Sequence, residues 1–260
     1  MNRILFHADE RDGPAVALRD RRARHIREVL HARVGDALKV GEIDGLTGTG
    51  RVESVTGLEV RLTVTLDREP PPPRIDLLLA LPRPKVLKRL WAQLAALGVG
   101  RIILVNAARV ERCYFDTHWL EPGHYTPLLI EGLEQAGTTH LPEVRIRRGF
   151  KPCIEDELPG DYADALKFLA HPGEETTSLE ALAKPSVCAS EGFRVQGSGG
   201  LNADSRPAAH RPLLAVGPEG GWTEYELAQF DACGFLRLSM GPRILRTDTA
   251  CIALLGRLSG

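Results

Sequence analysis

The chain has 260 residues, of which 43% are hydrophobic and 26% charged, so its composition is globular and argues against disorder over most of its length. Thirty-three Lys and Arg side chains against 34 Asp and Glu leave a formal charge of −1. This balance excludes a protein that binds nucleic acid through a uniformly basic surface, so any such binding must use local patches.

The first 69 residues are predicted to form a small β-barrel. Three stretches alternate apolar and polar residues as strands do, namely 36–43, 51–55 and 58–64. Asp44-Gly45 follows the first of them and is typical of a hairpin turn. One helix is expected to interrupt the barrel over 21–30, where Ile26, Val29 and Leu30 share a face.

Four consecutive prolines at positions 70–73 predict an extended linker and therefore a domain boundary, because proline fits neither a helix interior nor a central strand. From residue 74 to 260 the pattern changes to alternating strands and helices, which indicates an α/β domain with a parallel sheet. The expected strands are 75–81, 101–105, 165–170, 213–216 and 235–238. The expected helices are 84–97, 120–135, 223–233 and 247–258. Residues 194–212 are rich in Gly, Ser and Pro and are predicted to be a flexible surface insertion.

The sequence gives no sign of a membrane, disulfide or metal protein. The first residues contain no apolar signal-like segment and no apolar run approaches 18 residues, so we expect a cytoplasmic protein with no membrane partner. Five cysteines lack CxxC spacing, which argues against a disulfide framework and a zinc site. No other set of His, Cys or acidic residues has ligand spacing, so no metal is expected.

Positive charge is concentrated in two stretches, one in each predicted domain. Residues 19–33 hold six arginines against two acidic residues, and residues 74–112 hold eight Lys and Arg against two. Together they could form a surface that binds RNA phosphates, or they could be ordinary solvated helix faces. The candidate RNA-binding residues are Arg21, Arg22, Arg24, His25, Arg27, Arg83, Lys85, Lys88 and Arg89.

The segment 213–223 runs from a buried strand through a glycine-rich turn, Gly217-Pro218-Glu219-Gly220-Gly221, into a helix with a capping-box pattern. Glycines allow backbone N–H groups to approach a ligand, and ligands of parallel sheets collect at the carboxyl ends of strands. The spacing fits neither a P-loop nor a dinucleotide fingerprint, and Glu219 would repel a pyrophosphate. The turn either holds a ligand that is not a polyphosphate or is simply a tight connection.

Two further segments resemble this arrangement. Residues 238–250 join a strand to the last helix and place Arg243 and Arg246 beside the expected helix start. Residues 167–172 form a strand that ends at His171-Pro172, where a lone histidine is more often structural than catalytic.

These loops, in this order, resemble the SPOUT class of knotted methyltransferases, and more closely the RsmE family of 16S rRNA uridine-N3 methyltransferases. The resemblance rests on GPEGG at 217–221 and GPRILRTDTA at 241–250, supported by LAHP at 169–172 and EQAG at 134–137. It covers nearly the whole chain, since the segment from 25 to 36 also resembles the N-terminal barrel of that family.

The resemblance implies an α/β protein in which an N-terminal PUA-like β-barrel is followed by a SPOUT domain with a C-terminal deep trefoil knot. It also implies a homodimer that binds S-adenosylmethionine and modifies 16S rRNA in the small ribosomal subunit. The cofactor residues that it implies are Leu169, Ala170, His171, Gly217, Pro218, Glu219, Gly220, Gly221, Leu238, Ser239, Met240, Gly241, Ile244, Leu245, Thr247, Thr249 and Ala250.

The chemistry of the implied reaction suggests catalytic residues. Uridine N3 must lose a proton before it attacks the methyl group, and a guanidinium would stabilise the resulting anion. Arg246 is the first candidate for that role and Arg243 the second, while Asp248 or Glu219 could accept the proton or merely hold the loop. The alternatives are another SPOUT enzyme, acting on a ribose 2′-oxygen or a tRNA base, and a non-catalytic RNA-binding protein.

Overall fold

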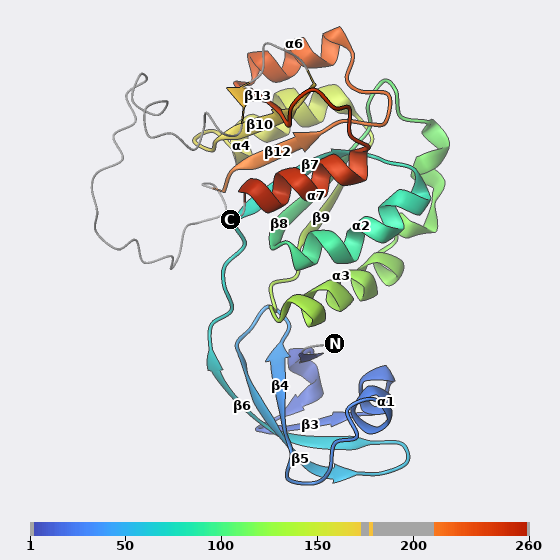
Figure 1. The fold of residues 1–260 in the computed structure, drawn as a ribbon, viewed down its shortest axis with the longest axis vertical. Helices are drawn as coiled ribbons and strands as arrows, with labels where there is room; N and C mark the ends of the chain where they lie inside the picture. Colours follow the sequence, from blue (N-terminus) through green and yellow to red (C-terminus); the bar gives the residue numbers. More distant parts are fainter. Residues whose placement is uncertain (1–2, 173–176, 179–210, 259–260) are drawn as a thin grey trace, which may run out of the picture.

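The computed structural model describes residues 3–172, 177–178 and 211–258, and these residues form two sheets joined by one connecting segment (Figure 1). Of the predicted insertion over 194–212, all but Arg211 and Pro212 lies outside the described residues. The four prolines at 70–73 have no regular secondary structure and connect the smaller, N-terminal sheet to the larger one.

The N-terminal sheet has six strands in the order β1-β4-β5-β6-β3-β2, with β1 parallel to β4 and the other pairs antiparallel. Its strands are β1 (Ile4–Phe6), β2 (Arg11–Asp12), β3 (Ala15–Leu18), β4 (Ala37–Glu42), β5 (Thr47–Val55) and β6 (Val60–Arg68). The three predicted strands and the turn at Asp44 are confirmed. The sequence did not predict β1 to β3, because two to four residues are too few to show an alternating pattern.

Helix α1 (Arg21–Glu28) covers one side of this sheet and begins at Asp20, whose carboxylate accepts from the Arg22 backbone N–H at 2.9 Å. The Arg22 side chain is buried, with 9% of the residue exposed. Its guanidinium donates to Asp20, to Glu10 and to the Leu5 carbonyl. Arg22 therefore holds the N-terminal domain together, and the expectation that it lies on the RNA-binding surface is corrected.

All seven strands of the larger sheet run parallel, in the order β11-β13-β10-β12-β7-β8-β9. These strands are β7 (Ile75–Ala80), β8 (Val99–Val105), β9 (Glu143–Arg147), β10 (Lys167–Ala170), β11 (Thr177–Ser178), β12 (Leu213–Val216) and β13 (Leu236–Ser239). The five predicted strands are present, and the predicted bounds of β12 are those observed. The edge strands β9 and β11 were not predicted, although β9 alternates apolar and charged residues.

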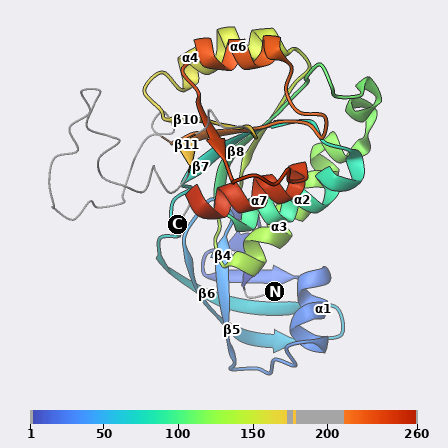
Figure 2. The ribbon, with the colours of Figure 1, turned by 45° about the horizontal axis from the view of Figure 1, so that its top comes forward.

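Helices cover both faces of the parallel sheet, with α2, α3 and α7 on one face and α4 and α6 on the other (Figure 2). Their bounds are α2 (Pro84–Ala96), α3 (Pro122–Ala136), α4 (Leu158–Asp161), α6 (Glu224–Ala232) and α7 (Thr247–Leu258). Three short helical segments lie between these elements in the described residues, namely η2 (Arg112–Asp116), η3 (His118–Leu120) and η4 (Pro152–Glu157). Another, η1 (Ala8–Glu10), lies between β1 and β2 of the N-terminal sheet. Two of the predicted helix ends have a clear cause: Gly98 turns the chain after α2 at φ +75°, and Thr223 caps α6.

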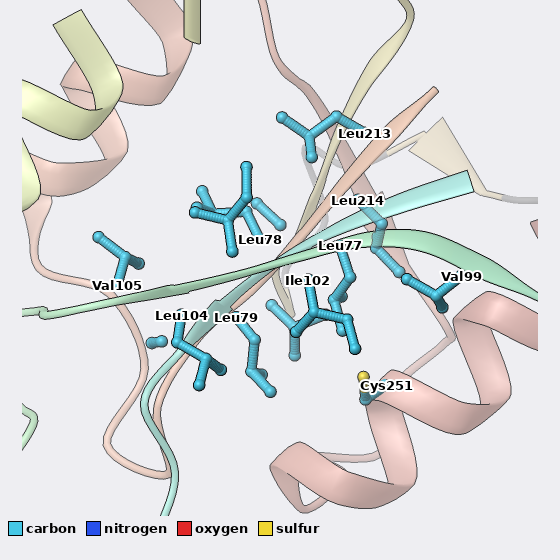
Figure 3. Packing of buried hydrophobic residues seen from close by; sticks show 14 of the residues in the cluster. Leu77, Leu78, Leu79, Val99, Ile102, Leu104, Val105, Leu213, Leu214 and Cys251 are labelled. Carbon is cyan, nitrogen blue, oxygen red and sulfur yellow. The ribbon is translucent and has the colours of Figure 1, made fainter. Parts of the chain in front are cut away.

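Strand β7 lies in the interior of the sheet, between β12 and β8, and all six of its residues are buried. Leu77 and Leu79 point to the same side of the sheet as Cys251 of α7, whereas Leu78 points to the opposite side (Figure 3). A strand covered on both faces has no solvent side, so β7 does not alternate between apolar and polar residues. Its one charged residue, Asp76, is fully buried and is paired with Arg211 at 2.8 Å.

The segment that follows α3 makes hydrogen bonds to the N-terminal sheet and so holds the two sheets together. Thr139 lies at the centre of this junction: its carbonyl accepts from the Asp44 N–H at 2.9 Å and its hydroxyl donates to the Gly45 carbonyl at 2.6 Å. Arg21 donates two hydrogen bonds, of 2.9 and 3.1 Å, to the buried carboxylate of Glu134. Burial raises the pKa of Glu134, although the Arg21 guanidinium opposes this shift.

The packing of β7 gives a testable expectation. Leu78→Ala should lower the free energy of unfolding by about 2–5 kcal/mol, because it removes a fully buried side chain and leaves a cavity. Leu58→Ala is the matched control, since Leu58 is 81% exposed and its truncation should cost less than about 0.5 kcal/mol. Urea denaturation of both variants measures the difference, and equal losses would contradict the assignment of β7 to the core.

Candidate active site

A pocket of about 290 Å³ lies at the carboxyl ends of β10, β12 and β13, beside the start of α7. Its volume is at the lower end of the range for small-molecule sites, which begins at about 300 Å³. The three loops that the sequence singled out meet here. All predicted cofactor residues except Leu169 and Thr249 line the pocket.

The glycine-rich turn after β12 is shaped by contacts that leave no room for side chains. A Cβ atom on Gly217 would lie 3.0 Å from the indole nitrogen of Trp222, which is 95% buried. Gly221 has φ +72°, and its N–H donates to the Pro218 carbonyl at 2.8 Å. Glycine is therefore required for close packing at Gly217 and for backbone conformation at Gly221.

Glu226 is buried, with 2% of the residue exposed, and its carboxylate holds the residues after this turn in place. One carboxylate oxygen accepts from the Thr223 N–H at 2.8 Å, which completes the capping box of α6. The other accepts from the Ala108 N–H at 2.7 Å, in the loop that follows β8. The same carboxylate thus binds two neighbouring loops together and satisfies two backbone donors.

The other two loops are also tied to their neighbours. The Thr247 hydroxyl donates to the Gly217 carbonyl at 3.2 Å, which holds the start of α7 against the end of β12. The His171 N–H donates to the Leu238 carbonyl at 3.0 Å, which holds the loop after β10 against β13. Burial lowers the pKa of the His171 imidazole, and the nearby Arg237 lowers it further, so His171 is neutral at pH 7.

The predicted catalytic residues occupy different positions around the pocket. Arg243 lines the pocket, whereas Arg246 and Asp248 lie outside its lining, at the start of α7. Arg246 is exposed, and its carbonyl accepts from the Ala250 N–H in the first turn of the helix. The carboxylate of Asp248 accepts from Arg89 of α2 at 2.9 Å. Asp248 and Arg89, predicted for catalysis and RNA binding respectively, are therefore ion-paired with each other.

The predicted RNA-binding residues of α2 lie close to the pocket. Arg83 precedes α2, and its N–H donates to the Glu219 carboxylate, which belongs to the pocket lining, at 3.4 Å. Lys85 and Lys88 are exposed on the first turns of the helix, and the Lys88 ammonium lies 4.6 Å from the centre of the Trp119 ring. Two exposed cations thus remain near the site on this helix.

The predicted RNA-binding residues of α1 are more often engaged in the fold. Arg21 is paired with Glu134, and Arg27 donates to the carbonyl groups of Thr56 and Gly57. His25 is half-buried, and its Nε2 atom has no partner among the described residues. Arg24 is exposed to solvent.

Three residues of this region were not predicted as site residues, and two of them had a detectable signal. Glu226 stood in the capping-box pattern that marked the start of α6. Arg109 follows a buried strand of the parallel sheet, the position where site residues are expected. Trp222 gave no such signal, because a buried tryptophan after a glycine turn is ordinary core.

Within residues 3–172, 177–178 and 211–258, no group of three or more His, Cys, Asp and Glu side chains is placed to hold a metal ion. No helix in those ranges is both long and apolar enough to cross a bilayer. Cys113, Cys153, Cys233 and Cys251 are free thiols. Burial raises the pKa of Cys153 and of Cys251 to about 12, so both are protonated at neutral pH.

Comparison with known proteins identifies the family of this chain. A family model described as an RNA methyltransferase domain matches residues 69–259. The ribosomal RNA small subunit methyltransferase E of Treponema pallidum is 31% identical over 97% of this chain and 88% of its own length. The chain belongs to the ribosomal RNA small subunit methyltransferase E family. The family member from Bacillus subtilis is 23% identical over 95% of this chain and 91% of its own length.

Two solved structures have the same fold as this family member. A methyltransferase from Legionella pneumophila, in complex with SAM, has a TM-score of 0.70 and 24% identity over 99% of this chain and 96% of its own. The small subunit methyltransferase E of Neisseria gonorrhoeae, bound to S-adenosylmethionine, has a TM-score of 0.70 and 23% identity over 98% and 95%. These likenesses establish the α/β architecture with one mixed and one parallel sheet.

The position of Glu226 gives a second expectation. Glu226→Gln should lower the free energy of unfolding by about 1–3 kcal/mol, because an amide nitrogen cannot accept the hydrogen bond that the carboxylate takes from a buried N–H. Glu224→Gln is the control, since Glu224 is exposed in the same first turn of α6. Urea denaturation of the two variants separates them. A loss as small as that of the control would show that the Glu226 contacts do not stabilise the site.

Proposed function

We propose that this chain transfers a methyl group from S-adenosylmethionine to N3 of a specific uridine in 16S rRNA of the small ribosomal subunit. The observation that carries the proposal is the convergence of the family's loop residues on one pocket. Membership of the family and the rRNA methyltransferase relatives support it. The SAM bound to the Legionella and Neisseria proteins supports the choice of cofactor.

We further propose that residues 1–69 form a PUA-like barrel, 70–73 a linker, and 74–260 a SPOUT domain with a deep trefoil knot. The separate N-terminal sheet and its own hydrophobic cluster support the first boundary. The hydrogen bond from the Thr247 hydroxyl to the Gly217 carbonyl holds the start of α7 against the glycine-rich turn, which supports a SPOUT-like arrangement of the C-terminal loops.

The pocket suits S-adenosylmethionine in shape and in chemistry. Val216, Leu238 and Leu254 supply an apolar wall, and the glycine turns bring backbone groups to the surface. The indole nitrogen of Trp222 is buried and has no partner among the described residues. When bound, the cofactor supplies a methyl group that is already activated by its sulfonium. The chain's task is therefore to orient the acceptor base and to make it nucleophilic.

The arginines of the last loop are suited to that task. Uridine N3 must lose a proton, and a guanidinium close to the base stabilises the anion and lowers the pKa of the imide. Arg243 lines the pocket and Arg246 lies three residues further along, at the start of α7. We assign the stabilising role to Arg246 first and to Arg243 second.

The ion pair with Arg89 changes the role of Asp248. Its carboxylate is bonded to the guanidinium and to the Thr249 N–H, so it holds α7 against α2 instead of accepting a proton from the base. Glu219 lies in the pocket lining and is exposed. Of the two carboxylates considered for proton removal, we therefore favour Glu219.

We propose that the RNA lies across the exposed cations of both domains. Arg24 on α1 and Arg83, Lys85 and Lys88 at the start of α2 are exposed and positively charged. The target uridine must be unpaired or turned out of a helix to bring N3 into the pocket, and these cations would hold the flanking phosphates.

We also propose that the active form is a homodimer. Ile244, in the loop that lines the pocket, is 87% exposed, and Met240 in the same loop is 40% exposed. Large apolar side chains this exposed beside a site mark a surface that binds a partner, because the partner removes their apolar area from contact with water. A second copy of the chain is the partner that the family resemblance implies.

Methyl transfer tests the function directly. Labelled S-adenosylmethionine would be incubated with small subunits that lack the modification, with free 16S rRNA and tRNA in parallel. We expect label in the subunit sample and one reverse-transcriptase stop at a uridine, because a methyl on N3 blocks base pairing. Label without a stop would place the methyl on a position that does not pair, and no label in any sample would contradict the proposal.

The assigned role of Arg246 gives a further expectation. Arg246→Ala should slow methyl transfer on the order of 100-fold or more, because it removes the charge that stabilises the base anion. Calorimetry should show unchanged affinity for S-adenosylmethionine. Arg257→Ala, in the last turn of the same helix, is the control and should transfer at the wild-type rate. A wild-type rate for Arg246→Ala would overturn its assignment and move it to Arg243.

A further inference from the structure

Arg109 occupies a position at the pocket that neither the predicted catalytic set nor the predicted RNA-binding set includes. It follows β8 at the carboxyl edge of the sheet and lines the pocket, yet it is exposed to solvent. One guanidinium nitrogen, Nη1, donates to the Gly220 carbonyl in the glycine-rich turn. Arg109 therefore lies where the pocket opens to solvent.

The Arg109 side chain is held in place by its surroundings. A Cβ atom on Gly220 would lie 3.1 Å from the Arg109 Cδ and 3.2 Å from its Cβ, so the aliphatic stem packs directly on the turn. The preceding residue, Ala108, is bonded to the buried Glu226 carboxylate. A guanidinium that is fixed before the ligand arrives loses little conformational entropy when it binds.

The chemistry of a fixed guanidinium at this position points to an anion. Arginine has five N–H donors in a planar fork that matches the oxygens of a phosphate, and the carbonyl of Gly220 accepts from one of the two Nη atoms. Arg83 and Arg112 are further exposed cations at the same edge of the sheet, after β7 and β8 respectively. A base that enters the pocket from this side brings its own phosphodiester past Arg109.

We infer that Arg109 is a substrate-binding residue that holds a phosphodiester group of the RNA nucleotide whose base enters the pocket. This inference rests on the proposed function, because it takes RNA as the substrate. It adds a contact that joins substrate binding to the cofactor turn, since the same side chain bonds to Gly220 and meets the RNA.

Salt-dependent binding of the full-length protein tests this inference. Arg109→Ala and Arg109→Lys would be compared with wild type for binding of unmethylated small subunits over a range of KCl concentrations. For Arg109→Ala we expect affinity to fall about tenfold and the slope of log K against log salt to become shallower by about 0.7–0.9, the value for one lost phosphate contact. Arg109→Lys should keep the slope and lose part of the affinity, because it retains the charge without the fork.

Two controls make the outcome specific. Lys151→Ala removes an exposed cation that does not line the pocket and should leave affinity and slope unchanged. Calorimetry with S-adenosylmethionine should give a smaller loss of affinity for Arg109→Ala than the subunit assay gives, because Arg109 contacts the cofactor turn only through Gly220. Unchanged subunit affinity and slope would overturn the inference, and a loss of cofactor affinity alone would assign Arg109 to the cofactor instead. Failure of the wild-type protein to bind cofactor or transfer methyl would refute the proposed function, and the slope comparison would still report the phosphate contact.

Discussion

The parallel pairing of the larger sheet is the constraint on which the rest of the molecule depends. Because every neighbouring pair of its strands runs in the same direction, the loops after β7, β8, β10, β12 and β13 all emerge at one edge. Segments that are far apart in the sequence, such as those holding Arg109 and Gly220, become neighbours there. The site is thus a product of topology, and side chains such as Glu226 only fix the loops that topology has gathered.

Much of this architecture could be predicted from the sequence, and the reasons are local. Strand β12 and helix α7 were predicted with their observed bounds, since the first is a short apolar run between breakers and the second begins at polar residues, Thr247 and Asp248. The pocket residues were found through the resemblance and through the glycine turns. The strands β1, β2, β3 and β11 were not found, because two to four residues without flanking turn signals do not distinguish a strand from a loop. The edge strand β9 was missed although its residues alternate.

The roles of the charged residues were the property that the sequence predicted least well. Counting arginines located the two basic stretches but did not distinguish a cation on the surface from one inside the fold. Arg22 is buried among two carboxylates and a carbonyl, Arg21 is paired with Glu134, and Arg89 with Asp248. Each partner is distant in sequence or indistinguishable from an ordinary surface acid, so only the three-dimensional structure separates structural arginines from those that are available to RNA.

The contacts around Thr139 have a consequence for which RNA the proposed function would favour. Hydrogen bonds from Asp44 and to Gly45, together with the buried Arg21–Glu134 pair, tie the N-terminal sheet to the end of α3. Helix α3 packs in turn on α2, whose first turn lies beside the pocket. A continuous set of contacts therefore links the N-terminal sheet to the start of α2. On the function proposed above, this link sets the span between the two places where RNA would be held. It would then favour a folded RNA of matching dimensions over a flexible strand that contains a uridine.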